Sequence, residues 1–228
     1  MLRRIARSVE LGKINADSPY PPELVGQDGT DECVRKALET GIPPKEVLNQ
    51  GLVAGMKTVG DRFRDGALFL PEVLMAARAL TAGFEHLKPY FRSGELKPKG
   101  TILIGTVAGD LHDIGKKIVS LFLEGGGWQV VDLGVDVPAG KFLAAIEAHQ
   151  PFAVALSTLL TTTMASMEAI TREIKAQRPG IRVIVGGAPL TRTFADRIGA
   201  DKYSADPQGA LDFLDSANRE INACTDAK

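Results

Sequence analysis

Residues 101–123 read TILIGTVAGDLHDIGKKIVSLFL. The apolar run at 101–107 predicts a buried strand, and the polar stretch that follows, 108–113, predicts a short loop. Apolar residues then recur at helical spacing from Ile114 onward, which predicts a helix. His112 therefore stands in the loop at the carboxyl end of a strand, at the edge where open α/β sheets bind their ligands.

The second half of the chain repeats this strand–helix alternation. Further strands are expected at 128–133, 152–157, 181–185 and 202–204, and further helices at 138–150, 164–177, 190–198 and 207–221. Continuous Val/Ile/Leu strands are typical of a sheet that is buried on both faces. The pattern predicts an α/β fold with a doubly wound, five-stranded parallel sheet of Rossmann or flavodoxin type.

The first half of the chain carries helical periodicity and no strand signal. Apolar residues recur at helical spacing over 31–40, 43–63 and 69–89, with turns between them. Helices joined by short turns predict a small antiparallel bundle. Residues 1–28 are poorly patterned, and the prolines of 18–22 break any helix there. The expected domains are an N-terminal extension (1–28), a helical bundle (29–93), a linker (94–100) and the α/β domain (101–228).

Composition excludes several classes of function. The formal net charge of −1 gives no reason to expect nucleic acid or an anionic membrane as a partner. No run approaches the ~20 apolar residues needed to cross a bilayer, and the basic start lacks the apolar core of a secretory signal. Cys33 and Cys224 form neither a disulfide framework nor a CxxC site. We therefore expect a soluble, cytoplasmic protein.

The loop after the first strand carries the residues best suited to bind a metal. A neutral imidazole such as that of His112 is a good ligand for transition metals. Its other ring nitrogen usually donates to a carboxylate, and Asp110 or Asp113 could accept that bond. His86 and His149 fall on unrelated helices, so a zinc site with three or four protein ligands is poorly supplied. A metal held in a macrocycle needs only one protein ligand.

Two other loops at the same edge of the sheet are unusual in composition. Residues 157–163 are dense in hydroxyls, and 186–189 offer bare glycine backbone that permits close approach of a bulky group. Taken singly, each feature has an ordinary explanation: a solvated histidine, a helix cap, or a plain turn. Their joint placement predicts a ligand site, and the residues alone leave the kind of ligand open.

Several motifs resemble those of a known family. The stretch GDLHDIGK at 109–116, Ser157-x-Leu159 and Gly186-Gly187 resemble the Asp-x-His-x-x-Gly, Ser-x-Leu and Gly-Gly motifs of cobalamin-binding domains. The match is closest to methyltransferase corrinoid proteins and to the cobalamin-binding module of methionine synthase. Residues 51–61 and 69–72 resemble the helical cap of that module, and 132–138 match as well. The resemblance covers about residues 30 to 215.

The resemblance implies a role for each matching residue. His112 would be the lower axial ligand of cobalt, displacing the cofactor's own benzimidazole, whose nucleotide tail would thread into the α/β domain. Asp110 would bond the histidine and Thr163 would be the hydroxyl partner, so that this relay takes up a proton when cobalt loses its axial ligand. The remaining residues expected to bind the cofactor are Gly109, Leu111, Asp113, Ile114, Gly115, Ser157, Leu159, Thr161, Gly186, Gly187 and Ala188.

The helical half would cover the other face of the cofactor. Phe63, Leu70 and Val73 match cap residues that lie over the upper face of cobalt, where the methyl group sits. Two departures stand out: the relay hydroxyl is Thr rather than the Ser of methionine synthase, and Pro207 stands where the family usually has a small residue.

The resemblance implies a methyl carrier rather than a complete enzyme. The cofactor would be methylcobalamin or a related corrinoid, which as cob(I)alamin takes a methyl group from a donor held by a substrate-specific methyltransferase. A second methyltransferase would pass the methyl group to tetrahydrofolate or a thiol, and a reductive activase is a further expected partner. The alternatives are a cobalamin-dependent regulator, a mutase subunit that uses adenosylcobalamin, and a receiver-like phosphoacceptor with Asp110 phosphorylated.

Overall fold

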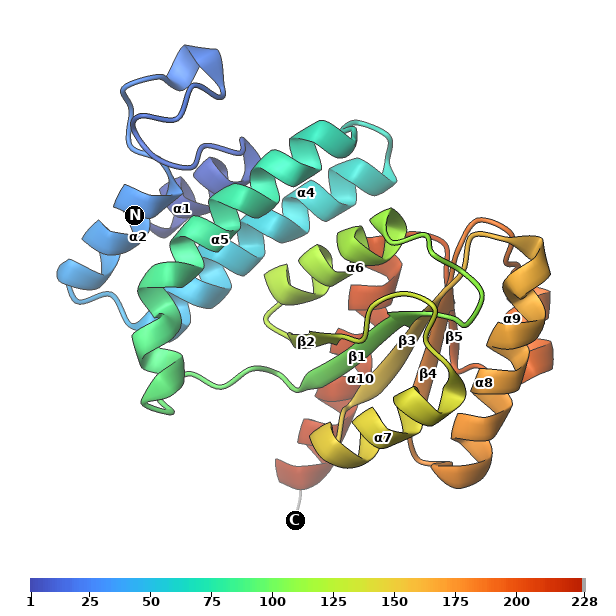
Figure 1. Ribbon diagram of the computed structural model, residues 1–228. Coiled ribbons are helices and arrows are strands. Elements are labelled where there is room, and N and C mark those ends of the chain that lie inside the picture. Colours follow the sequence, from blue (N-terminus) through green and yellow to red (C-terminus); the bar gives the residue numbers. More distant parts are fainter. Residues whose placement is uncertain (227–228) are drawn as a thin grey trace. The chain divides into compact units, whose positions relative to one another are not determined.

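The computed structural model describes residues 1–226 and divides into two compact units, one of residues 1–98 with 125–127 and one of the other described residues (Figure 1). The first unit is helical and the second is an α/β unit, which confirms the predicted fold class. No helix within residues 1–226 is long and apolar enough to cross a membrane.

The α/β unit is built on five parallel strands, counted over the described residues. They are β1 (Thr101–Thr106), β2 (Gln129–Asp132), β3 (Ala153–Ser157), β4 (Arg182–Gly186) and β5 (Lys202–Ser204). Their order is β2-β1-β3-β4-β5, so the direction of winding reverses between β1 and β3. In open α/β sheets the ligand crevice lies outside the carboxyl ends of the strands at this reversal. The loops after β1 and β3 are therefore neighbours at that crevice.

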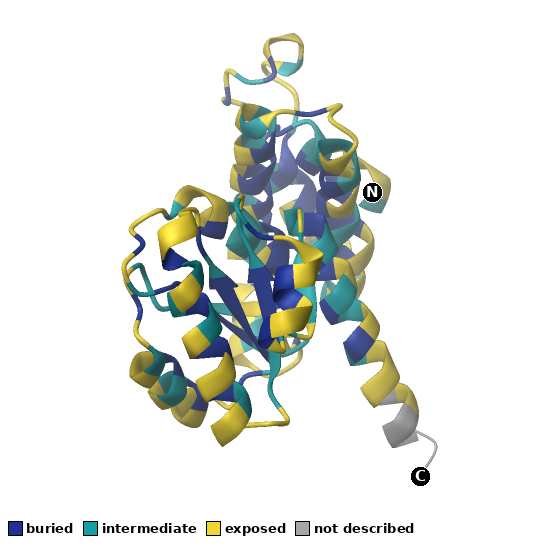
Figure 2. Cartoon of the chain, turned by 90° about the vertical axis from the view of Figure 1, so that its right-hand side faces the viewer, coloured by how far each residue is buried: buried dark blue, intermediate teal, exposed yellow. Residues whose placement is uncertain are grey.

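Helices cover both faces of the sheet. They are α6 (Ile114–Gly125), α7 (Ala139–His149), α8 (Met164–Gln177), α9 (Arg192–Ile198) and α10 (Pro207–Asp226). Alternate strand residues point to opposite faces: Leu103 and Val154 join a core with α7, α8 and α9, whereas Ile102 and Ile104 join a core that includes Leu214 of α10. Because helices cover both faces, the three central strands β1, β3 and β4 are largely buried, whereas the flanking strands β2 and β5 are partly exposed (Figure 2).

The helical unit confirms the three helical stretches predicted for residues 31–89. They form α2 (Thr30–Glu39), a continuous helical run made of α3 (Pro44–Glu46), the π-helix η2 (Val47–Val53) and α4 (Ala54–Arg64), and α5 (Leu70–Arg92). A short 3₁₀ turn, η1, spans Pro22–Leu24. Cys33 is buried in α2, and the side chain of Cys224 lies outside the described residues.

One helix of this unit was not predicted from the sequence. Residues 2–10 form α1 (Leu2–Glu10), with Ile5 and Val9 fully buried. A Cβ at Gly51 would lie 2.9 Å from the Ile5 side chain, and one at Gly55 would lie 2.6 Å from a backbone oxygen of α1. Two glycines four residues apart therefore let α1 pack closely on η2 and α4. The prediction of an unpatterned N-terminus was wrong for these residues because tertiary packing stabilises the helix.

Helix α5 also extends one turn beyond the expected end at Pro89. The carbonyl of Pro89 accepts a hydrogen bond from the Ser93 N–H at 2.9 Å, so the helix reaches Arg92. Proline removes only its own N–H bond, and the groups that follow it can still complete the last turn.

Candidate functional site

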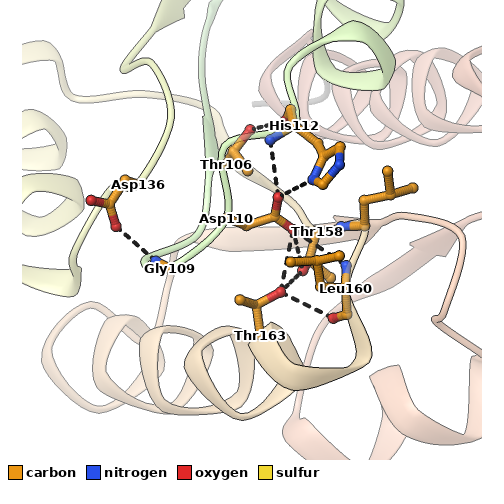
Figure 3. A network of polar contacts seen from close by, with 9 residues as sticks. Thr106, Gly109, Asp110, His112, Asp136, Thr158, Leu160 and Thr163 are labelled. Carbon is orange, nitrogen blue, oxygen red and sulfur yellow. Dashed lines mark hydrogen bonds and ion pairs between the residues drawn. The ribbon is translucent and has the colours of Figure 1, made fainter.

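The loops after β1 and β3 bring the predicted relay residues together (Figure 3). Thr106 at the end of β1 pairs in register with Ser157 at the end of β3, so the segments that follow both strands leave the sheet side by side. Asp110 and His112 come from the first loop, and Thr158 and Thr163 come from the second.

Asp110 is the centre of this network and has no exposed surface. Its Oδ1 accepts hydrogen bonds from the backbone N–H of His112 at 3.0 Å and from the ring Nδ1 of His112 at 2.7 Å. Its Oδ2 accepts from the Leu159 N–H at 2.6 Å and from the Thr158 hydroxyl at 2.9 Å. The carboxylate is thus fixed from both loops at once.

These donors determine the charge of Asp110. Burial alone would raise the pKa of this carboxyl. The N–H groups of Leu159 and His112, the His112 ring and the Thr158 hydroxyl outweigh burial and hold the pKa of Asp110 well below its usual range. The group is therefore a carboxylate at neutral pH.

The charge of Asp110 fixes the protonation of the His112 ring. A carboxylate only accepts hydrogen bonds, so the Nδ1 that faces it carries a proton. A neutral ring then presents the lone pair of Nε2, and half of the side chain, 51%, is exposed. The Thr106 hydroxyl donates to the backbone carbonyl of His112 at 2.9 Å and holds the loop from below. The arrangement offers one oriented nitrogen ligand with a carboxylate behind it.

The two carboxylates that the sequence left open as partners of His112 are now distinguished. Asp113 forms an ion pair with Lys117 within the first turn of α6, and this lysine lowers the pKa of Asp113. Asp110 alone of the two contacts the His112 ring. Among residues 1–226, no cluster of three or more His, Cys, Asp or Glu side chains could hold a metal ion.

The structure adds Thr158 to the relay, a residue that the sequence pattern did not single out. Its hydroxyl is buried and lies 2.9 Å from Oδ2 of Asp110, whereas that of Thr163, the predicted partner, lies 3.2 Å away. The Thr163 hydroxyl also lies 2.6 Å from that of Thr158 and 3.0 Å from the Leu160 carbonyl. Because each hydroxyl has one proton and Thr163 has three acceptors within reach, Thr158 is the better placed donor to Asp110.

Large apolar side chains are exposed on both loops around this network. Leu111 and Ile114 flank His112 and are 72% and 65% exposed. Leu159 and Leu160, whose backbone N–H groups point at Asp110, are 44% and 38% exposed. Apolar side chains left in water near a polar network mark a ligand surface. They suit a broad, largely apolar ligand that covers the loops and receives one nitrogen from the protein.

The glycines of the site differ in what surrounds them. Gly187 has φ +143°, and a Cβ there would lie 1.7 Å from the Thr158 carbonyl oxygen, so only glycine lets the β4 loop meet the β3 loop. Gly186 pairs in register with Ser157, and its carbonyl accepts from the Thr158 N–H at 3.2 Å. Gly115, the second residue of α6, has no heavy atom within 4 Å of a Cβ built on it.

The other predicted cofactor residues lie in the same loops or in the helical unit. Gly109 is held by the carboxylate of Asp136 at 2.7 Å, while Thr161 and Ala188 are exposed on the loops after β3 and β4. In the helical unit, Phe63 and Leu70 are half-buried and Val73 has no exposed surface. The role of these three over the upper face of cobalt stays a prediction.

Replacing Asp110 by Asn is expected to destabilise the cofactor-free protein by about 2 kcal/mol, because an amide group cannot accept from every donor that faces it. The folded-state pKa of Asp110 is lowered. Its contribution to stability is therefore complete above the unfolded value of about 4 and is lost as the pH falls through the folded value.

Urea unfolding of both proteins between pH 3 and pH 7 tests this expectation. The difference between wild type and Asp110→Asn should be constant above about pH 5 and should shrink at lower pH. A difference that grows as the pH falls would contradict the assigned charge of Asp110.

Comparison with known proteins points to one family. Two family models, each described as a B12 binding domain, match residues 100–211 and 27–88. The chain is 45% identical over 176 residues to trimethylamine corrinoid protein 1 of Methanosarcina acetivorans, covering 75% of this chain and 82% of that protein. It is 43% identical to dimethylamine corrinoid protein 1 of the same organism, covering 81% and 88% of the two chains.

Two solved structures are similar over most of the chain. A cobalamin-binding protein from Desulfitobacterium hafniense has a TM-score of 0.73 at 29% identity, covering 93% of this chain and 97% of that chain. The methanol:cobalamin methyltransferase complex of Methanosarcina barkeri has a TM-score of 0.79 at 30% identity, covering 96% and 79%.

Proposed function

Because this chain belongs to the family of B12-binding corrinoid proteins that includes the trimethylamine and dimethylamine corrinoid proteins, we propose that it carries methyl groups between two methyltransferases. The observation that carries the proposal is the buried Asp110 carboxylate that orients His112 at the reversal point of the sheet. A carrier of this kind needs one protein ligand to cobalt below and free access above.

The residues of the site fit a corrinoid. The bound cofactor supplies the cobalt atom that accepts and gives away a methyl group. His112 would hold the cobalt through Nε2, and Asp110 fixes the orientation of the ring. The exposed side chains of Leu111, Ile114 and Leu159 would pack against the macrocycle. Gly115 would leave room for the nucleotide tail, whereas the space at Gly187 is filled by the Thr158 backbone, so that this glycine would serve by letting the β4 loop meet the β3 loop.

The relay has a defined resting place for a proton. Because Nδ1 of His112 faces Asp110, Nε2 is the ring nitrogen that would either hold the metal or take up a proton. Asp110 competes poorly for that proton, because the Leu159 N–H and the Thr158 hydroxyl stabilise its ionised form. The hydrogen bond from Nδ1 of His112 to Asp110 would keep the ring in the same orientation whether or not Nε2 holds the metal.

The methyl donor that we propose is a methylamine. The relatives with the names trimethylamine and dimethylamine corrinoid protein are 40–45% identical to this chain over 75–84% of its length. A methylamine-specific methyltransferase would load the carrier, and a second methyltransferase would unload it to a thiol or to tetrahydrofolate. A reductive activase would return cobalt to its lowest oxidation state after accidental oxidation.

The test is a transfer assay with the reconstituted protein. The carrier is loaded with hydroxocobalamin, reduced chemically and mixed with methyltransferases specific for trimethylamine, dimethylamine or methanol, each with its own substrate. Release of dimethylamine from trimethylamine, or of methylamine from dimethylamine, supports the proposal. Activity with methanol alone would contradict the proposed donor, and activity with none would contradict the carrier function.

Replacing Gly115 by Ala should separate folding from cofactor binding. Open space around this helical glycine means that alanine raises the stability of the cofactor-free protein, by up to about 0.5 kcal/mol. If the nucleotide tail passes there, the added methyl group crowds it and weakens cobalamin binding about tenfold.

The matched control is Gly140→Ala, because Gly140 is also the second residue of its helix, α7, and also lies in open space. This variant should keep wild-type affinity in a cobalamin titration followed by visible absorbance. Equal affinities for the Gly115 and Gly140 variants would mean that the tail does not pass Gly115.

A further inference from the structure

Asp136, in the loop between β2 and α7, holds the backbone of the His112 loop at two points. Its carboxylate accepts a hydrogen bond from the Gly109 N–H at 2.7 Å, and its own backbone N–H donates to the Asp110 carbonyl at 3.0 Å (Figure 3). Gly109 and Asp110 are thus both hydrogen-bonded to Asp136, one to its side chain and one to its backbone.

The backbone of Asp136 adopts a conformation that favours glycine. Its φ is +53°, in the left-handed region that L-residues with a Cβ enter at an energetic cost, although Asp and Asn tolerate it best. Glycine would relieve this strain and would fit any role as a simple turn residue. A residue with a strained backbone beside a functional loop points to a task for its side chain. The carboxylate that binds Gly109 is that side chain.

The same loop also holds the far end of the His112 segment. Asp132, at the end of β2, forms an ion pair with Lys116, whose side chain is buried in the first turn of α6. The other oxygen of Asp132 accepts from the Gly134 N–H at 2.8 Å, which fixes the carboxylate. Residues 132–136 therefore contact both ends of the segment 109–116.

We propose that Asp136 is a positioning residue for the axial ligand, resting on the proposed function in which His112 binds cobalt. The Asp110 side chain is held by the β3 loop through Thr158 and Leu159. Asp136 holds the backbone of the same residue from the β2 loop. Because both the side chain and the backbone of Asp110 are fixed, its carboxylate has a single position, and this position sets the orientation of the His112 ring. Without Asp136, His112 would reach cobalt in only part of the molecules.

Three proteins test the proposal: wild type, Asp136→Gly and Asp136→Asn. Glycine relieves the strain at φ +53° but removes the acceptor for the Gly109 N–H. Asparagine keeps an oxygen acceptor and also tolerates the left-handed region. If Asp136 is only a turn residue, the glycine variant will position His112 at least as well as wild type. If the Asp136 carboxylate positions the loop, the asparagine variant will keep this function and the glycine variant will lose it.

Two measurements are expected to separate the variants. In the cofactor-free protein, amide hydrogen exchange of Gly109 should be about tenfold faster in Asp136→Gly and near wild type in Asp136→Asn. After loading with cobalamin and reduction to Co(II), electron paramagnetic resonance of Asp136→Gly should show a mixture of forms with and without a histidine nitrogen. The urea midpoint of Asp136→Gly should be equal to or above that of wild type.

The outcomes distinguish this inference from its premise. If wild type and Asp136→Gly both show histidine nitrogen at full occupancy, the inference is wrong and the proposed function stands. If wild type itself shows no histidine nitrogen, ligation of cobalt by His112 is wrong and the inference that rests on it is wrong with it, whereas the carrier function is tested separately by the transfer assay. Loss of histidine ligation in Asp136→Gly together with its retention in Asp136→Asn would establish the positioning role.

Discussion

Replacing His112 by Ala is expected to abolish ligation of cobalt by the protein and to weaken cobalamin binding by about 100-fold. Loss of an outer-shell partner already lowers metal affinity by 10–100-fold, and His112 is proposed as the ligand itself. The fold should be almost unaffected, because half of the His112 side chain is exposed and the ring bonds only to Asp110 among the described residues. The free energy of unfolding should change by less than about 1 kcal/mol.

The control for this variant is His149→Ala, at the exposed end of α7 in the same unit. It should leave both the visible spectrum of bound cobalamin and the dissociation constant at wild-type values. In His112→Ala the spectrum should change to that of a corrinoid without a protein nitrogen ligand. A His112→Ala protein with the wild-type spectrum and affinity would remove His112 from the site.

Replacing Gly187 by Ala should destabilise the cofactor-free protein by about 3 kcal/mol or more. A Cβ at this position would lie 1.7 Å from the Thr158 carbonyl oxygen, and φ of +143° strains any other residue. Because the clash is with backbone, no side-chain rotation relieves it, and the β3 and β4 loops must separate. Thr158 would then move away from Asp110, so cobalamin binding should fall together with stability.

Urea unfolding of the cofactor-free protein measures the first effect. Gly180→Ala is the control, because Gly180 lies in open space in the turn before β4 and has an ordinary φ. This control should unfold within about 0.5 kcal/mol of wild type. Equal stabilities for Gly187→Ala and Gly180→Ala would show that the two loops do not lie as close together as the structure has them.

Much of the α/β unit could be predicted because the central strands β1, β3 and β4 are buried and each helix has one apolar face. Helix α8 and strand β5 have the predicted bounds, and the ends of the other strands differ from the prediction by at most one residue. Helix α1 was missed although Leu2, Ile5 and Val9 recur at helical spacing, because the segment is short and basic. The packing that holds it depends on Gly51 and Gly55, which are far away in sequence.

The relay shows the same distinction between local and distant information. Asp110 and His112 were predictable as a pair because they are two residues apart in one loop. Thr158 and Asp136 come from other loops, and only the strand register and the loop backbones bring them to Asp110 and Gly109. The sequence showed a hydroxyl-rich segment at 157–163 but did not show which hydroxyl meets the carboxylate. Contacts between side chains of different loops can be identified only from the three-dimensional structure.

Ligation of cobalt by His112 is tested most directly by electron paramagnetic resonance of the Co(II) protein with histidine labelled by ¹⁵N. If His112 is the ligand, cobalt will couple to a single histidine nitrogen, and the splitting will change on ¹⁵N labelling and disappear in His112→Ala. Coupling that does not respond to the histidine label, as from the cofactor's own benzimidazole, would contradict His112 as the lower ligand.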